Sequence, residues 1–143
     1  MGSTTEETRE VAQRFYEAAT GGGGEAMDAL LAPDATWWIL GHGFRDRSKF
    51  LKTLADAAAG MESRGPIDMT SMSMRLELIA LMADGDKAGI EFEREITWEG
   101  GGYHQNYYLG LTVSDGLVVA FREYASSAAA KKAGLYDKGL LKD

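Results

Sequence analysis

One arginine and one glutamate in the C-terminal half of the chain interrupt patterns that are otherwise apolar. Between residues 90 and 98, Arg94 falls on the same alternating face as isoleucine, phenylalanine and tryptophan. Glu123 interrupts the apolar face of residues 117–124 in the same way. A carboxyl group on an apolar face loses hydration, which raises its pKa towards the range useful in general acid/base catalysis. A nearby arginine lowers that pKa again and holds the carboxylate by charge-assisted hydrogen bonds. Glu123 and Arg94 are therefore candidate catalytic residues.

The segment between these two residues adds hydrogen-bonding groups to the same face. Along residues 103–113, Tyr103, Gln105 and Tyr107 share one alternating face with the apolar residues at 109, 111 and 113. Their hydroxyl and amide groups suit the polarisation of a carbonyl or the stabilisation of a developing oxyanion, and Tyr107 is the third candidate catalytic residue. The positions predicted to bind substrate lie in the interior or at its rim, and they are Trp37, Ile39, His42, Met74, Phe92, Tyr103, Gln105 and Phe121.

Each candidate also has an interpretation without chemistry. Arg94 and Glu123 could form a buried ion pair that contributes to the specificity of the fold more than to its stability. Tyrosines in strands commonly serve as packing residues with their hydroxyls in water, and Gln105 could be a polar residue with satisfied hydrogen bonds. His42 could be a solvated histidine in a glycine-flanked loop, and His104 is predicted to face outwards. Because the two histidines lie on different segments, no metal site is predicted.

Three predicted strands carry the candidate residues, and they cover residues 90–98, 103–113 and 117–124. Alternate side chains of a strand point to opposite faces of a sheet, so the turns decide which faces join. We predict a three-residue hairpin loop over residues 114–116, which pairs Tyr107 with Glu123. A two-residue Asp-Gly turn would instead place Glu123 beside Tyr108 and mix the apolar and polar faces.

The rest of the chain predicts helices followed by a further strand region. A capping-box pattern at Thr4 and Glu7 begins the first helix, which ends at the glycines 21–24. In the first strand, Trp37 is predicted to face inwards and Trp38 outwards. The further elements expected are a helix over 25–31, a strand over 34–41, a loop over 41–43, a helix with Asp46 or Ser48 as N-cap, and a strand region over 67–82.

This order of elements predicts an α+β domain. Helices that cover one side of an antiparallel sheet bury its apolar face. We expect a cone-shaped, strongly curved, mixed or antiparallel β-sheet wrapped on about three N-terminal helices, as in a cystatin-like α+β barrel. The open mouth of such a cone is a natural small-molecule site. We predict one domain over residues 1–143, with a polar N-terminus at 1–4, and a short helix and small mobile tail at the C-terminus, about 128–143.

Composition argues against several classes of function. The net charge of −7 disfavours binding to the phosphates of nucleic acids. The chain has no cysteine, which rules out disulfides, thiol nucleophiles and thiolate metal sites. It has no apolar run long enough to span a bilayer, and its polar, acidic N-terminus does not resemble a signal peptide. We therefore expect a cytoplasmic protein with no nucleic acid, membrane, metal or cofactor as partner.

Four short motifs follow one another along the chain. They are Asp34-Ala-Thr-Trp37, Gly85-Asp86, Tyr103 with Tyr107, and Asp115-Gly116 followed by Arg122-Glu123-Tyr124. With these motifs, the chain resembles a SnoaL-like member of the nuclear transport factor 2-like superfamily over about residues 6–127. That superfamily includes ketosteroid isomerases, polyketide cyclases, limonene-epoxide hydrolases, dehydratases, phenazine-biosynthesis A/B proteins and non-catalytic binders. The resemblance implies the fold and leaves the reaction open.

Taken residue by residue, the resemblance favours Glu123. The phenazine-biosynthesis A/B proteins use a last-strand glutamate as acid/base, and Glu123 stands in that place. The limonene-epoxide hydrolases use an Asp-Arg-Asp set, of which Arg94 and Glu123 match two members while Ile96 replaces the third. The ketosteroid isomerases place their base near the position of Ile39. The resemblance therefore implies acid/base chemistry at Glu123 more strongly than it implies the mechanism of the limonene-epoxide hydrolases or that of the ketosteroid isomerases.

We expect a cofactor-independent enzyme that acts on an apolar cyclic or aromatic small molecule by proton transfer, as a lyase, isomerase, cyclase or hydrolase. The alternative is a non-catalytic small-molecule-binding or assembly module on the same fold. A homodimer is expected with either function. Asn106, Tyr108 and Tyr124 make the outer face of the sheet too aromatic to remain fully hydrated, and the family commonly pairs through that face.

Overall fold

The computed structural model describes residues 3–21, 24–62, 73–125 and 128, and these residues form three helices and one six-stranded sheet. The helices are α1 (Thr5–Thr20), α2 (Gly24–Leu30) and α3 (Arg47–Glu62). The strands are β1 (Leu31–Ile39), β2 (Gly43–Asp46), β3 (Ser73–Asp84), β4 (Lys87–Trp98), β5 (Gly101–Ser114) and β6 (Leu117–Tyr124). The predicted α+β class is confirmed. In the described part of the chain, no helix has the length and apolar character needed to cross a membrane.

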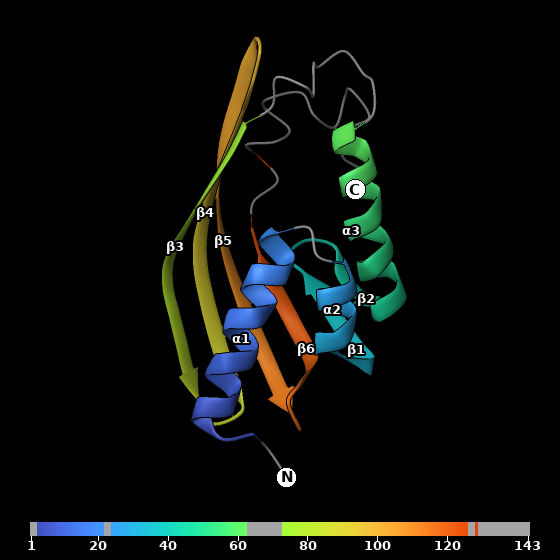
Figure 1. Cartoon of the computed structure of the whole chain (residues 1–143), viewed down its shortest axis with the longest axis vertical. Coiled ribbons are helices and arrows are strands. Elements are labelled where there is room, and N and C mark those ends of the chain that lie inside the picture. Colours follow the sequence, from blue (N-terminus) through green and yellow to red (C-terminus); the bar gives the residue numbers. More distant parts are fainter. Residues whose placement is uncertain (1–2, 22–23, 63–72, 126–127, 129–143) are drawn as a thin grey trace.

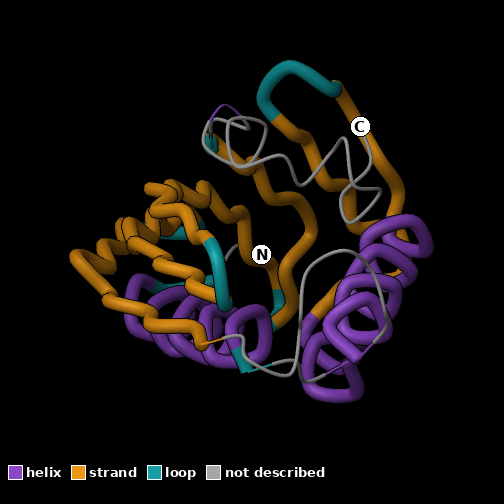
Figure 2. Tube along the Cα trace, turned by 90° about the horizontal axis from the view of Figure 1, so that it is seen from above, coloured by secondary structure: helices purple, strands orange, loops and turns teal. Residues whose placement is uncertain are grey.

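The sheet is mixed and runs in the order β2-β1-β6-β5-β4-β3. β1 and β6 are parallel, and all the other neighbouring strands are antiparallel. Figure 1 shows α1 packed across the long strands β3, β4 and β5, and α3 beside β1 and β2. Seen from above, the sheet curls strongly around the helices without closing (Figure 2). The predicted curved sheet wrapped on N-terminal helices is therefore confirmed.

Aromatic rings from two helices and two strands meet at the centre of the core. Phe15 of α1 lies edge-on to Phe121 of β6 with ring centroids 5.1 Å apart, and Phe121 lies 4.7 Å from Phe50 of α3. Trp37 of β1 contacts Phe50 at 4.9 Å, so it faces inwards as predicted. All four side chains are buried, and edge-to-face aromatic pairs stabilise a core beyond the area that they bury. These contacts fix both helices over the sheet.

The turn between β5 and β6 is shorter than predicted. Asp115 and Gly116 have φ values of 52° and 77°, the two positive values of a type I′ hairpin turn. Ser114 then pairs directly with Leu117, so the predicted three-residue loop is wrong. If this register continued without a break, Phe121 and Glu123 of β6 would lie on the face of the sheet opposite the apolar face of β5.

A β-bulge at Val119 restores the alignment of the two strands. At this point β6 contributes one residue more than β5 to the ladder, and an inserted residue reverses the side-chain alternation beyond it. Past the bulge, Glu123 pairs with the buried Leu109. The predicted pairing of Glu123 with Tyr107 is therefore wrong by two residues, although the glutamate does lie on the apolar face.

The other elements agree with the predictions except at their ends. Asp46 caps α3 as expected, because its carboxylate accepts the amide of Lys49 at 2.8 Å. Residues 43–46 form β2 rather than a loop and the start of a helix, since their backbone pairs with β1. The start of the predicted strand at 67–72, the glycines 22–23 and nearly all of the predicted C-terminal tail lie outside the described residues.

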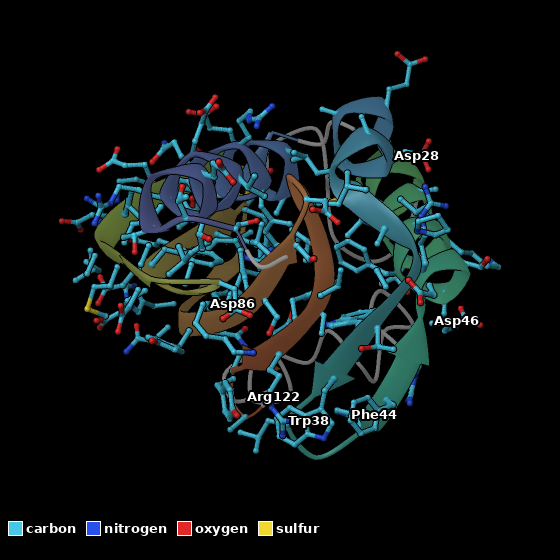
Figure 3. The ribbon with its side chains drawn as sticks, turned by 90° about the horizontal axis from the view of Figure 1, so that it is seen from below. Asp28, Trp38, Phe44, Asp46, Asp86 and Arg122 are labelled. Atoms are coloured by element: carbon cyan, nitrogen blue, oxygen red, sulfur yellow. The ribbon has the colours of Figure 1, made fainter. Side chains whose placement is uncertain are left out.

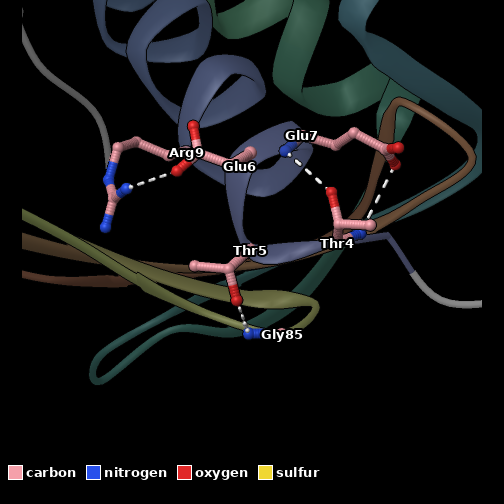
Figure 4. Close-up of polar contacts among 6 residues, drawn as sticks. All are labelled: Thr4, Thr5, Glu6, Glu7, Arg9 and Gly85. Atoms are coloured by element: carbon pink, nitrogen blue, oxygen red, sulfur yellow. Dashed lines mark hydrogen bonds and ion pairs between the residues drawn. The ribbon is translucent and has the colours of Figure 1, made fainter.

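The first turn of α1 is joined to the turn between β3 and β4. The Gly85 amide donates to the Thr5 hydroxyl at 2.8 Å, and the Thr8 hydroxyl donates to the Gly85 carbonyl at 2.6 Å. Figure 4 shows the Thr5 contact beside the capping box of Thr4 and Glu7. Gly85 has a φ of 59°, a conformation that glycine adopts without steric cost. Helix side chains thus satisfy both backbone polar groups of this turn residue and set the position of α1 on the sheet.

Thr8→Val is expected to lower the free energy of unfolding by about 1–3 kcal/mol, because the Gly85 carbonyl loses its donor in a part-buried place. Urea unfolding followed by circular dichroism measures the change. Thr53→Val in α3 is the matched control, since its hydroxyl donates to the carbonyl of Lys49 in its own helix, and the expected change is about 0.5 kcal/mol or less. Equal losses in the two variants would contradict the importance of this contact.

Candidate functional site

Cross-strand pairing places the candidate residues in successive rows on the inner face of the sheet. Paired residues of neighbouring strands share a face and lie in side-chain contact. One aromatic row therefore separates the row of Glu123 from the row of Arg94. In order along the strands, the rows are Ile39–Glu123–Leu109–Ile90, then Phe92–Tyr107, then Arg94–Gln105, then Ile96–Tyr103.

Glu123 is a half-buried carboxyl among apolar neighbours. Its row partners Leu109 and Ile90 are buried. Its backbone carbonyl accepts a hydrogen bond from the Leu40 amide at 3.0 Å, which joins β6 to the end of β1. Burial raises the pKa of Glu123, and the charge of Arg94 lowers it in part. Loss of hydration is the larger effect, so this glutamate holds its proton more strongly than an exposed one.

Arg94 directs its hydrogen bonds to phenol hydroxyls. Its Nη2 donates to the Tyr103 hydroxyl at 3.2 Å and also to the Tyr107 hydroxyl. The guanidinium carbon lies 5.0 Å from the centroid of the Tyr107 ring, within the range of a cation–π interaction. The buried Nε of Arg94 has no hydrogen-bond partner among the described residues. The contact ion pair with Glu123 that the sequence allowed does not form between these two described residues, and Arg94 acts on that carboxyl across space.

Tyr16 joins this site from α1, and the sequence analysis missed it. Its ring lies edge-on to Phe92 with centroids 5.3 Å apart, and Phe92 stacks on Tyr107 at 4.8 Å with an interplanar angle of 4°. A column of rings therefore leads from α1 to Arg94. Burial raises the pKa of the Tyr16 hydroxyl, which keeps it protonated. A signal was present in the sequence, because Tyr16 follows the buried Ala12 by four residues and so borders the apolar face of the helix.

The other predicted substrate-binding residues do not gather at one point. Trp37 and Phe121 lie in the aromatic core and form the base of the cone. Ile39 is half-buried in the same row as the carboxyl. Met74 is 40 % exposed in the row beyond the arginine. His42 lies in the turn between β1 and β2, where its carbonyl accepts a hydrogen bond from an arginine of β2. Among the described residues, the predicted polar groups of the inner face therefore lie between the row of Glu123 and the row of Tyr103.

The outer face of the sheet carries a separate group of residues. The guanidinium carbon of Arg122 lies 4.0 Å from the Trp38 ring centroid, and Figure 3 shows both residues beside Phe44, away from the helices. His104 also faces outwards, as predicted, and lies 3.6 Å from Glu93. Within the described ranges, no group of three or more histidines, aspartates or glutamates is placed to hold a metal ion. The outer arginine is a natural comparison for the inner one, because each lies over an aromatic ring.

This arrangement has the groups needed to move a proton at an apolar surface. A carboxyl with a raised pKa can take a proton from carbon and return it near neutral pH. The hydroxyls of Tyr103 and Tyr107 accept hydrogen bonds from Arg94, so the cation polarises them as donors. Such donors stabilise an oxygen that gains negative charge during a reaction.

A family model for the SnoaL-like domain matches residues 12–121. The comparison with curated proteins gives no match. Among solved structures, a candidate ketosteroid isomerase from Kribbella flavida DSM 17836 is similar, with a TM-score of 0.63 and 23% identity over 85% of this chain and 79% of that chain.

Two further solved structures share the fold. An LEH-like epoxide hydrolase of M. tuberculosis has a TM-score of 0.67 and 18% identity, over 95% of this chain and 94% of that chain. IdmH from Streptomyces antibioticus, a candidate polyketide cyclase, has a TM-score of 0.69 and 18% identity, over 88% of this chain and 96% of that chain. At these identities the similarity establishes the fold alone.

Arg94→Met is expected to raise the pKa of Glu123, because it removes the charge that lowers this pKa and leaves the burial that raises it. Carboxyl-resolved NMR titration of the wild type and the variant measures the shift. Arg122→Met removes an arginine from the outer face and should leave the titration of Glu123 unchanged. An unchanged or lower pKa in Arg94→Met would show that the two groups are not coupled.

Glu123→Gln is expected to stabilise the protein at neutral pH and to have little effect in acid. Above the ordinary pKa of 4.5, the native carboxyl still holds a proton that the unfolded chain releases. The stability of the wild type therefore falls as pH rises from this value through the raised native pKa, whereas glutamine does not titrate. Urea midpoints from about pH 4 to about pH 8 should show a growing advantage of the variant. A constant difference across this range would argue against a raised pKa.

Proposed function

Because this chain belongs to the SnoaL-like family, we propose that it is a cofactor-independent enzyme that transfers protons by general acid/base catalysis on an apolar cyclic or aromatic small molecule. The observation that carries the proposal is the half-buried Glu123, whose pKa is raised by burial on the inner face of the sheet. A lyase, isomerase, cyclase or hydrolase could each use such a group. The names of the similar structures fall within these classes, as a candidate ketosteroid isomerase, a candidate polyketide cyclase and an LEH-like epoxide hydrolase.

In the proposed reaction, the carboxylate of Glu123 removes a proton from a carbon next to a carbonyl group. The electron pair of the broken C–H bond moves to the carbonyl oxygen and forms an enolate. The hydroxyls of Tyr103 and Tyr107, polarised by Arg94, stabilise the oxyanion. Glu123 then returns the proton to a different carbon in an isomerisation, or to a leaving group in an elimination.

The position of Glu123 supports this role in a further way. The family resemblance places the base of ketosteroid isomerases near Ile39. Glu123 is the partner of Ile39 on the neighbouring strand, so its carboxyl can serve the same part of the cone from β6. Ile39 and Phe92 then provide apolar contacts to the substrate, and Gln105 a polar one.

A non-catalytic small-molecule-binding or assembly module is the second candidate function. The observation in its favour is the aromatic core, in which Trp37 and Phe121 pack against Phe15 and Phe50. These side chains fill the base of the cone instead of leaving it open to a substrate. A module of this kind would bind its ligand near Arg94 and would leave the carbon–hydrogen bonds of that ligand untouched.

We further propose that the protein is a cytoplasmic homodimer that pairs through the outer face of its sheet. Phe44, Tyr108 and Tyr124 are 66, 38 and 39 % exposed there, and Trp38 lies among them. Large aromatic groups gathered on one face favour association, because burial of their surface removes it from water. The absence of cysteine is compatible with a reducing compartment.

Exchange of carbon-bound protons tests the catalytic proposal without knowledge of the natural substrate. In deuterium oxide, the wild type is expected to accelerate exchange next to the carbonyl of 2-tetralone, as followed by NMR. Glu123→Gln should reduce this acceleration by about 10²–10⁴-fold, the usual contribution of a general base. Glu91→Gln, on the outer face of β4 opposite Tyr108, is the control and should match the wild type.

Two outcomes would count against the catalytic proposal. Acceleration that survives Glu123→Gln would remove the glutamate from its assigned role. Binding of 2-tetralone without any acceleration would favour the non-catalytic module.

A further inference from the structure

The guanidinium of Arg94 has more donors than the described residues use. A guanidinium carries five N–H donors, and the two hydrogen bonds that Arg94 makes to described residues both leave from Nη2. Its Nε is buried without a hydrogen-bond partner in the same part of the structure. Both acceptors are neutral phenols, so these contacts do not neutralise the charge. A half-buried cation of this kind gains free energy when an anion binds it.

The acidic residues closest to Arg94 in sequence do not supply that anion. Glu93 and Glu95 flank it on β4 and therefore point to the outer face of the sheet. There, Glu95 forms an ion pair with Arg75 at 2.7 Å, and Glu93 lies near His104. On the inner face, Glu123 stands beyond the aromatic row. The place beside Arg94 is thus suited to an anion brought by a ligand.

An aromatic row separates the strand positions of Arg94 and Glu123 on the inner face. Residues two apart in a strand are separated by about 6.5 Å, so the two rows lie about 13 Å apart along the backbone. The arginine and glutamate side chains shorten this interval from both ends. Phe92 and Tyr107 occupy the row between as parallel rings. A ligand of one or two fused rings could lie along this row with one end at each charged group.

We propose that Arg94, together with the Tyr103 hydroxyl, binds the carboxylate of an aromatic acid whose ring lies along Phe92 and Tyr107 towards Glu123. Because Nη2 of Arg94 already donates to both phenols, one carboxylate oxygen would accept from Nη1 and the other from the Tyr103 hydroxyl. The Tyr103 hydroxyl accepts from Arg94 and so keeps its own proton to donate. The inference deepens the proposed function by naming a substrate class, and it rests on that function only in assigning the reacting end to Glu123. With Tyr103 bound to the carboxylate, the Tyr107 hydroxyl is the donor that remains for the oxyanion.

Binding of 2-naphthoate and 2-naphthamide to the full chain tests this inference, because the two probes share a ring system and differ in charge. Isothermal titration calorimetry at neutral pH is expected to give about ten- to hundredfold tighter binding of 2-naphthoate, the range of a charge-assisted contact. Arg94→Met should remove this preference. Arg122→Met removes the arginine that lies over Trp38 on the outer face and should retain the preference.

Further variants separate the inference from misfolding and from catalysis. Arg94→Lys keeps the charge without the planar guanidinium and should keep part of the preference. Tyr103→Phe should weaken the binding of 2-naphthoate and not that of 2-naphthamide. Glu123→Gln should keep or increase the preference, because it removes a like charge, although it is expected to reduce the acceleration of proton exchange.

Three results would overturn the inference. They are equal affinity of the wild type for both probes, no binding of 2-naphthoate at millimolar concentration, and a preference that survives Arg94→Met in a folded variant. None of them alters the exchange test of Glu123, so failure here is distinct from failure of the proposed function.

Discussion

The alternation of side chains along a strand is the constraint on which the site depends. The β5–β6 turn reverses the chain with two residues, and an unbroken ladder from it would place Glu123 beside Tyr108 on the outer face. The extra residue at Val119 reverses the alternation of the rest of β6. Phe121 can then pack against the rings of α1 and α3. One local irregularity therefore completes the core and, at the same time, takes a carboxyl group out of water.

The distance between the two charged residues sets the chemistry of the inner face. In direct contact, Arg94 would hold Glu123 ionised and locked, which gives a stable ion pair and a poor base. With the row of Phe92 and Tyr107 between them, the arginine lowers the pKa of the carboxyl only in part, and burial remains the larger effect. The same separation turns the guanidinium towards the tyrosine hydroxyls. Glu123 and Arg94 therefore lie at two ends of an apolar surface, and their charges do not neutralise each other in a contact ion pair.

Patterns of period 2 and of helix capping predicted most of this arrangement. Alternation alone placed Arg94 and Glu123 on the inner face, since each shares a face with apolar residues of its own strand. It did not decide between Trp37 and Trp38, because Trp38 shares the opposite face with the apolar Leu40. No signal in the sequence predicted the bulge at Val119, because valine is also common in regular strands. Tyr16 was missed because it lies at the border of a helix face, where hydrophobic periodicity does not separate core from pocket. Sequence therefore revealed which face Arg94 and Glu123 occupy, while the pairing along that face required the structure.

Two arginines stacked on aromatic rings, one on each face of the sheet, show why only the inner one is suited to binding. Arg122 is exposed over Trp38, so water satisfies the donors that the protein leaves unused, and an added ion pair there would be worth little. Arg94 is half-buried over Tyr107, and its Nε lies out of reach of solvent. Hydrogen bonds to a charged group become stronger as water is excluded. Both arginines thus stack on an aromatic ring, but with different consequences. Arg122 makes a surface contact, whereas Arg94 is a partly buried cation whose remaining N–H groups are best satisfied by a ligand.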